Sequence, residues 1–321
     1  MALVNDVTVE IVFAGTPGVA IPSLQSLVES QHEIQAVITQ PPAPSGRGRK
    51  ITPSPVEDFA RQHSIPVLAP GRIADISDEL RDLSPDCIPV VAYGQLIPAD
   101  MLGIPRLGWV NLHFSLLPSW RGAAPVQHAI RSGDQITGCT TFILDQGMDS
   151  GPVLGTMTEV IQPSDTSGDL LNRLAVAGAV LLRQSIDALE AGKLVPQPQS
   201  PDGVSYAPKI MKADAKVDWK LPAFEVDRRI RSCTPVPGAW FQYFIKDGSH
   251  DSIGIGPVEL VREQSSELDL VPGQVVIERK RIVVGTGSHP VALGQVTPGG
   301  RRTMRATDWI RGLSNAPEFF A

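Results

Sequence analysis

Cysteine is scarce in this chain, which has only Cys87, Cys139 and Cys233 among its 321 residues. The three are odd in number and far apart, and no CxxC or other paired spacing occurs. This usage excludes a disulfide scaffold and favours a reducing compartment. Cys139 lies in an expected strand, and we interpret it as a core residue.

Positive charge is also in short supply, with 28 Lys and Arg against 34 Asp and Glu and a net charge of −6. An acidic balance argues against a protein that coats nucleic acid without selectivity, but it leaves room for a local basic surface. No apolar run reaches the ~18 residues that span a bilayer. The opening MALVNDVTVE is neither Arg-rich nor followed by a signal-like apolar stretch. We therefore expect a cytoplasmic protein with no membrane partner.

The motifs of metal and serine hydrolase chemistry are missing as well. There is no HExxH, no Cys/His cluster and no GxSxG, and the six histidines are scattered. We therefore expect no metal site. The length favours two domains, each with a full apolar core.

The first part of the chain alternates strand and helix patterns. Residues 8–14 form a β-branched run, a helical pattern follows, and residues 34–39 form a second run. The alternation continues through strands expected at 86–92, 109–113 and 137–144 to a helix at about 169–191. It predicts an α/β domain with a mostly parallel sheet over residues 1–192. The first turn, AGTPGVA, is a weak nucleotide signal and is more simply a structural turn, in which Gly15 and Gly18 allow close packing.

The composition and the predicted secondary structure change after residue 192. Residues 193–208 contain four prolines and indicate a linker or a wrapping strand. Residues 209–321 carry a short helix at 223–232 and then β-type runs such as 238–245 and 252–261, which suggest a small barrel or sandwich. Charge divides in the same way: residues 1–211 hold 13 basic and 21 acidic residues (13 − 21 = −8), whereas residues 212–321 hold 15 and 13 (15 − 13 = +2).

Asn111 and His113 are the first candidates for chemistry. They stand two apart at the end of an expected strand, so their side chains lie on the same face. The carboxyl ends of parallel strands are where open α/β sheets hold ligands. An amide donor beside an imidazole suits a developing oxyanion and a proton transfer near neutral pH. A buried, mutually satisfied polar pair is the alternative.

Two loops are further candidates. Residues 145–151 (DQGMDSG) carry two acids, and an acid there would orient His113, keep it protonated or accept a proton; a solvated turn is the alternative. The loop at 40–55 carries Arg47, Arg49 and Lys50 among prolines and glycines. A phosphate partner explains such a cluster, and an ordinary solvated loop explains it equally well.

Together these motifs resemble the methionyl-tRNA formyltransferase family, over about residues 8–313. SLLPSWRGAAP at 115–125 is similar to the family's signature. The resemblance implies a catalytic triad of Asn111, His113 and Asp149. It also implies 10-formyltetrahydrofolate as the formyl donor, bound along the VVAYGQLIP wall at 90–98 and at the SLLP stretch. The implied contact residues are Val91, Ala92, Tyr93, Gly94, Ser115, Leu116, Leu117 and Pro118.

The same resemblance implies the acceptor and the architecture. The formyl group would pass to the α-amine of initiator methionyl-tRNA, with no metal and no covalent enzyme intermediate. The fold would be a Rossmann-like formyltransferase domain followed by an OB-like barrel at 209–321, in a monomer. Contacts to tRNA would come from Arg47, Arg49 and Lys50 and from the C-terminal Arg228, Arg229 and Arg231. Phe114 and Ser119 depart from the family pattern, which more often has Pro or Ala and then Arg.

Other functions share some of these features. A nucleotide-sugar N-formyltransferase would use the same triad and folate with an amino-sugar acceptor. A glycinamide ribonucleotide formyltransferase is less favoured because it usually lacks such a second domain, and a formyltetrahydrofolate hydrolase would use water. A non-catalytic RNA-binding protein would use only the basic loop and the barrel, and the intact triad and SLLP segment argue against it.

Overall fold

The computed structural model describes residues 8–45, 48, 50–244, 250–261, 269–313 and 317–321. The chain forms two compact units, and each is built from three stretches of sequence. The first unit comprises Met1–Pro125, Ile136–Val160 and Leu171–Ala207, and the second comprises Val126–Gln135, Ile161–Leu170 and Pro208–Ala321. In the part of the chain that the structure describes, no helix combines the length and apolarity that a bilayer crossing requires.

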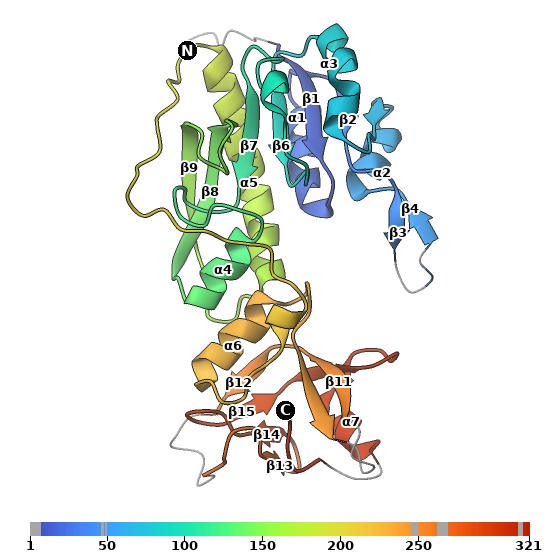
Figure 1. Cartoon of the computed structure of the whole chain (residues 1–321), viewed down its shortest axis with the longest axis vertical. Coiled ribbons are helices and arrows are strands. Elements are labelled where there is room, and N and C mark those ends of the chain that lie inside the picture. The colour runs from blue at the N-terminus through green and yellow to red at the C-terminus, as the bar shows by residue number, and fades with distance from the viewer. Residues whose placement is uncertain (1–7, 46–47, 49, 245–249, 262–268, 314–316) are drawn as a thin grey trace. The chain divides into compact units, whose positions relative to one another are not determined.

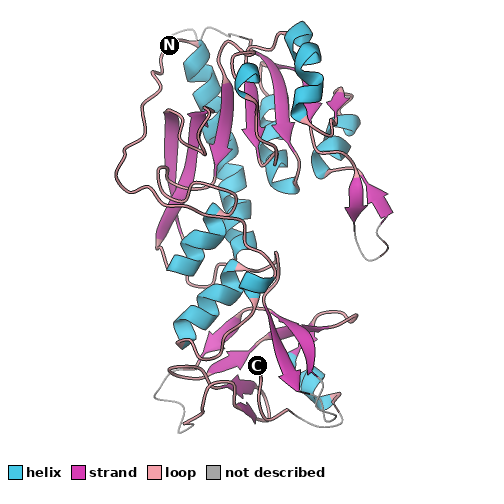
Figure 2. Cartoon of the chain, in the orientation of Figure 1, coloured by secondary structure: helices cyan, strands magenta, loops and turns pink. Residues whose placement is uncertain are grey.

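A seven-stranded sheet organises the first unit (Figures 1 and 2), in the order β5-β2-β1-β6-β7-β8-β9. Its strands are β1 (Glu10–Gly15), β2 (Glu33–Ile38), β5 (Val67–Leu68), β6 (Ile88–Val91), β7 (Trp109–His113), β8 (Ile136–Ile143) and β9 (Val153–Val160). The first five run parallel, whereas β8 is antiparallel to β7 and β9 is antiparallel to β8. The predicted Rossmann-like, mostly parallel sheet is confirmed, with an antiparallel edge that the sequence patterns did not indicate.

Helices alternate with these strands along the chain. They are α1 (Ile21–Val28), α2 (Pro55–Gln62), α3 (Ser77–Leu83), α4 (Pro125–Ser132) and α5 (Ser167–Glu190), with short 3₁₀ turns η1 (Gly18–Ala20), η2 (Ile73–Ile76) and η3 (Ala99–Met101). The last two helices, α4 and α5, belong partly to the second unit. Ser54 caps α2 by accepting a hydrogen bond from the Glu57 amide at 3.0 Å, and Pro55 occupies the first helical position. A short hairpin of β3 (Ala43–Ser45) and β4 (Lys50–Thr52) precedes α2.

Close packing explains the small residues and the cysteines. A Cβ on Gly15 would lie 2.8 Å from Phe13 and 3.0 Å from the Val91 carbonyl oxygen, so the predicted structural role of this turn glycine is confirmed. Gly18 faces open space, so nothing in its packing requires a glycine. Cys139 is fully buried on β8, as predicted for a core residue, and Cys87 and Cys233 are also buried free thiols.

The second unit carries two four-stranded antiparallel sheets, ordered β10-β11-β16-β17 and β12-β15-β14-β13. The strands are β10 (Trp240–Phe244), β11 (His250–Ile255), β12 (Val258–Leu260), β13 (Val275–Ile277), β14 (Ile282–Val284), β15 (Val291–Leu293), β16 (Gln295–Pro298) and β17 (Met304–Arg305); the helices are η4 (Ala213–Ala215), α6 (Ala223–Ser232) and α7 (Ala306–Arg311). The run expected at 252–261 is two strands, because Gly256 and Pro257 interrupt the ladder. Trp219, Phe241, Trp309 and Phe320 form its aromatic core.

Candidate active site

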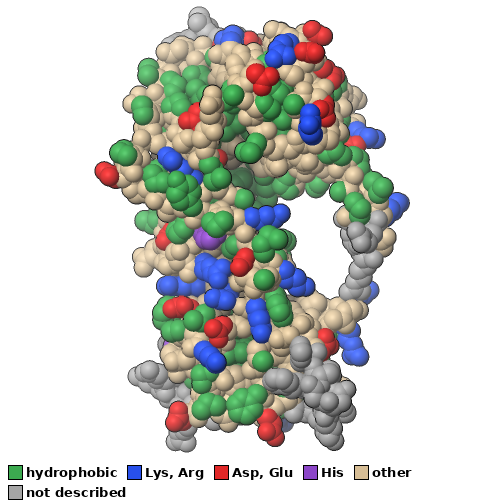
Figure 3. Space-filling view, in the orientation of Figure 1, with side chains coloured by type: hydrophobic (Ala, Val, Ile, Leu, Met, Phe, Trp, Pro, Cys, Tyr) green, Lys and Arg blue, Asp and Glu red, His purple; other side chains and the backbone are tan. Residues whose placement is uncertain are grey.

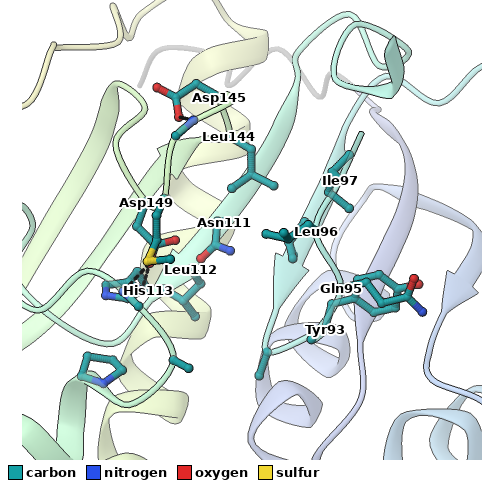
Figure 4. Close-up of a pocket in the computed structure, with 18 of the residues that line it drawn as sticks. Tyr93, Gln95, Leu96, Ile97, Asn111, Leu112, His113, Leu144, Asp145 and Asp149 are labelled. Atoms are coloured by element: carbon teal, nitrogen blue, oxygen red, sulfur yellow. Dashed lines mark hydrogen bonds and ion pairs between the residues drawn. The ribbon is translucent and has the colours of Figure 1, made fainter. Parts of the chain in front are cut away.

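A cavity of about 510 Å³ opens where β6 and β7 end (Figure 4). Its walls come from the stretch after β6, from β7 and the loop that follows it, and from the loop after β8. The lining residues are Val90, Ala92–Ile97, Asn111–Phe114, Gly122, Ala123, Pro125 and Leu144–Asp149. The cavity therefore lies at the carboxyl edge of the parallel strands, where the sequence predicted a site.

Asn111 and His113 both line this cavity from β7, as their two-residue spacing predicted. The His113 side chain is only 7% exposed. Its Nε2 lies 2.9 Å from the Trp120 carbonyl oxygen, which can only accept, so Nε2 carries a proton. Its Nδ1 lies 3.7 Å from Asp149 Oδ2, a charge contact longer than a hydrogen bond. The structure thus brings together all three residues of the predicted triad (Figure 4).

Two opposing influences set the protonation of His113. Burial lowers the pKa of its imidazole below the ordinary value because the charged ring loses hydration. The Asp149 carboxylate and the Trp120 carbonyl act in the other direction and raise it. Both partners stabilise the imidazolium rather than the neutral ring, so the site can hold or release a proton.

Asp149 is held in an uncommon backbone conformation, with φ of +47°. Its Oδ2 accepts a hydrogen bond of 2.7 Å from the Gly122 amide, which belongs to the loop after β7. Gly122 has φ of +123°, and a Cβ there would lie 2.7 Å from the Ala207 carbonyl oxygen. A left-handed non-glycine residue costs about 1–3 kcal/mol and persists only where its surroundings enforce it. The two loops therefore fix each other at the site.

The other acid of the loop at 145–151, Asp145, has a different role. Its Oδ1 accepts hydrogen bonds of 2.9 Å from the Gly147 amide and from the Ser150 hydroxyl. This is an Asx-type turn at the exposed rim of the cavity. The solvated-turn alternative therefore describes Asp145, whereas Asp149 faces the imidazole.

The two stretches expected to bind folate differ in placement. Ala92, Tyr93 and Gly94 line the cavity, and Val91 is fully buried behind them. The Tyr93 carbonyl is fixed by Thr16 Oγ1 and Gln40 Nε2, each at 3.1 Å. Burial raises the pKa of the Tyr93 phenol to about 12, so it stays neutral. The wall predicted at 90–98 includes Gln95 and Leu96, and the predicted loop at 145–151 includes Met148, but none of the three was singled out as a contact residue. Leu96 and Met148 are 90% and 60% exposed apolar side chains in the cavity lining.

The SLLP stretch, residues 115–118, is absent from the cavity lining. Ser115 is fully buried, and its hydroxyl donates to the Ser119 carbonyl at 2.6 Å. Thr140 Oγ1 donates to the Ser115 carbonyl at 2.7 Å and accepts from the Leu117 amide at 3.1 Å. Leu116 and Pro118 are half-buried. These contacts brace the loop that presents Trp120 to His113.

The basic residues expected to bind tRNA fall into three groups. Arg47 and Arg49 lie outside the described residues, and Lys50 is exposed at the start of β4. Arg228 and Arg229 are half-buried on α6; Arg228 stacks on Phe224, and Arg229 donates to the Lys216 carbonyl at 2.9 Å. Figure 3 shows Lys and Arg side chains gathered on the face of α4 and α6.

Arg231 differs from Arg228 and Arg229, because it is only 8% exposed. Its Nε donates to Asp227 Oδ2 at 2.8 Å, and its guanidinium also donates to the Asp165 carbonyl at 2.9 Å. These contacts within the second unit enclose the guanidinium, which argues against a phosphate contact at Arg231. Among the residues that the structure describes, no three His, Cys, Asp or Glu side chains gather as metal ligands would.

Comparison with known proteins identifies the family. Residues 9–186 match the formyl transferase family model, and residues 209–314 match that of the formyl transferase C-terminal domain. Methionyl-tRNA formyltransferase from Thermobifida fusca is 54% identical over 304 residues, which cover 94% of this chain and 96% of that protein. The enzyme of the same name from Acidothermus cellulolyticus is 52% identical over 322 residues, with 96% and 98% covered.

Solved structures show the same fold at low identity. HypX from Aquifex aeolicus in complex with tetrahydrofolic acid has a TM-score of 0.64 at 17% identity, with 96% of this chain and 48% of that chain covered. The sugar 3N-formyl transferase WlaRD has a TM-score of 0.63 at 16% identity, with 92% and 99% covered. The two domain matches and the near full-length identity lead to one conclusion: the chain belongs to the formyl transferase family, among the methionyl-tRNA formyltransferases.

Proposed function

We propose that this chain transfers the formyl group of 10-formyltetrahydrofolate to the α-amine of initiator methionyl-tRNA, giving the N-formylmethionyl-tRNA that starts translation. The observation that carries the proposal is identity of 50–54% over nearly the whole chain to proteins of that activity. The similarity to sugar formyl transferases stays at 16–17% identity and supports the fold alone. The amino-sugar acceptor is therefore the less supported alternative.

The cavity fits the formyl donor in size and chemistry. Its 510 Å³ lies within the ~300–1,000 Å³ typical of small-molecule sites. Apolar side chains at Leu96, Ile97 and Leu144 offer a wall for a flat heterocycle, and the turn at 92–94, with exposed Ala92 and Gly94, lines the cavity with them. We assign the folate contacts to Ala92, Tyr93 and Gly94. Val91 and residues 115–118 support the site from behind.

The geometry suggests how the triad acts in acyl transfer between two nitrogens. The folate supplies the formyl group, and the amine of the aminoacyl ester attacks its carbon. Asn111 and the protonated His113 stabilise the oxygen that gains charge in the tetrahedral intermediate. Asp149 favours the imidazolium across 3.7 Å and helps to relay the proton that the leaving N10 requires.

The C-terminal third of the chain is assigned to tRNA. Residues 1–192 form the catalytic domain, residues 193–208 the connection, and residues 209–321 an OB-like tRNA-binding domain. The supporting observations are the antiparallel strands of the second unit and the basic side chains on α6. Arg228 and Arg229, together with Lys50, Arg47 and Arg49 of the N-terminal loop, would contact the phosphate backbone. We propose a monomer acting in the cytoplasm, where its acceptor is used.

One assay tests the proposal against its alternatives. The protein is supplied with 10-formyltetrahydrofolate and either charged initiator tRNA, an amino-sugar nucleotide or water alone, and the destination of the formyl group is measured. Formyl transfer to methionyl-tRNA is expected. Removing one oxyanion donor typically costs ~10²–10³ in kcat, so Asn111→Ala should lose activity on that scale while remaining folded. Transfer only to the sugar, or only to water, would refute the assignment.

A further inference from the structure

The proline-rich stretch at 193–208 is paired with both loops of the active site. Near its start, the backbone of Gln197 exchanges hydrogen bonds of 2.7 and 2.8 Å with Val153, just after the loop that carries Asp149. Near its end, the Arg121 amide donates to the Ser205 carbonyl at 2.9 Å, and the Ala207 amide donates to the Arg121 carbonyl at 2.7 Å. The residues between these two anchors are therefore held on a fixed frame beside the site.

Gln199 lies between the anchors, and its side-chain amide bridges the two loops. Its Nε2 donates to the Asp149 carbonyl at 2.8 Å and to the Gly151 carbonyl at 2.9 Å. Its Oε1 accepts from Arg121, at 2.6 Å from one terminal nitrogen and 3.2 Å from Nε. The flipped amide would set NH₂ against a guanidinium and oxygen against two carbonyls, so this orientation follows from the partners.

The Gln199 side chain bridges the two loops next to Asp149, the proposed catalytic acid. Asp149 has φ of +47°, and its carboxylate takes a hydrogen bond from Gly122 in the loop to which Arg121 belongs. The side-chain amide of Gln199 donates a hydrogen bond to the carbonyl of this same strained residue. We propose that Gln199 is a positioning residue that holds Asp149 against His113; the inference rests on the proposed role of Asp149 in formyl transfer.

The first test compares two glutamines of one stretch. Displacing a reacting group by about 1 Å costs up to ~10²-fold, so Gln199→Ala should lower kcat by about 10-fold to 100-fold. The KM values for the folate and the tRNA should stay within about two-fold. Gln197→Ala is the matched control, because its exposed side chain donates to the Val195 carbonyl at 3.0 Å, away from both loops. A wild-type kcat in Gln199→Ala would overturn the proposal.

A second substitution separates positioning from bulk packing. Gln199→Glu keeps the acceptor for Arg121 and nearly the same shape, but it presents an oxygen to the carbonyls of Asp149 and Gly151. We expect a kcat at least as low as that of Gln199→Ala in a protein that remains folded at the assay temperature. If Gln199→Glu restores the wild-type kcat, then filling space is the role of Gln199, and the inference fails.

A measurement without turnover distinguishes this inference from the proposed function. NMR of the His113 ring nitrogens follows its titration in the full-length protein. Asp149 raises the pKa of His113 against the effect of burial, so releasing Asp149 in Gln199→Ala should move the titration to lower pH. An unchanged titration would contradict positioning whatever the enzyme does. A fully active His113→Ala would instead refute the proposed mechanism and leave the NMR result standing.

Discussion

Replacing Asp149 with asparagine tests the electrostatic core of the site. The variant keeps the shape and a carbonyl oxygen that can accept the 2.7 Å hydrogen bond from Gly122, but it removes the negative charge 3.7 Å from His113 Nδ1. At that distance, with an effective dielectric constant of ~20, a full charge pair is worth about 4 kcal/mol. Burial continues to disfavour the imidazolium, so the pKa of His113 falls further below its ordinary value in the variant.

The consequence is a rate loss that depends on pH. We expect kcat at neutral pH to fall by roughly 10²-fold to 10³-fold, the scale of one lost electrostatic contact in a transition state. A histidine with a lowered pKa is charged only at lower pH. The ratio of Asp149→Asn to wild-type kcat should therefore rise as pH falls, and taking the ratio cancels titration of the acceptor amine.

The assay is formylation of charged initiator tRNA across a pH series, with the titration of His113 followed by NMR. Asp100→Asn serves as the control, because Asp100 is exposed and lies outside the cavity lining. A rate ratio that does not change with pH would refute the reasoning, as would a His113 titration at or above its wild-type position.

Three further predictions concern residues around the site and in the second unit. Gly122→Ala should lower the free energy of unfolding by about 1–3 kcal/mol, because its Cβ would meet the Ala207 carbonyl oxygen at 2.7 Å in a left-handed conformation; chemical denaturation measures this. Arg231→Met should lower the thermal midpoint while leaving the tRNA KM of the folded enzyme near wild type, since its guanidinium is enclosed. A raised tRNA KM with an unchanged thermal midpoint would instead show that Arg231 contacts tRNA. Arg228→Ala and Lys50→Ala should raise the tRNA KM and flatten its salt dependence without moving the folate KM.

Much of the site was predictable because it depends on local patterns. The spacing of Asn111 and His113 on an apolar run fixes both the strand and the shared face. Strand β9 was not predicted because its sequence, VLGTMTEV, mixes small and polar residues. Its half-buried and exposed positions alternate, but the half-buried ones include Gly155 and Glu159, so the alternation does not appear as an apolar pattern. Antiparallel pairing of β8 leaves no mark on a single strand, since register and direction are set by partners distant in sequence.

The remaining differences arise from contacts over long sequence distances. Gln199 is 50 residues from Asp149, and nothing in its own neighbourhood marks it as part of a site. Arg231 belongs to the same helix as Arg228, and only tertiary packing shows that its guanidinium turns inward and donates to the Asp165 carbonyl, 66 residues away in the sequence. Composition could therefore identify a basic helix, but it could not identify which of its cations reach solvent.

The discontinuous make-up of the second unit limits how the protein can be dissected. Its stretch Ile161–Leu170 supplies the Ser167 hydroxyl, which donates to the Thr234 carbonyl at 2.7 Å, and the Gly168 amide, which donates to the same oxygen at 3.1 Å. A truncation that begins at Pro208 would discard these donors together with the fully buried side chain of Leu170. The C-terminal third of the sequence is thus not a module to be excised or grafted as a linear piece. Its folding requires residues synthesised before the catalytic unit is complete.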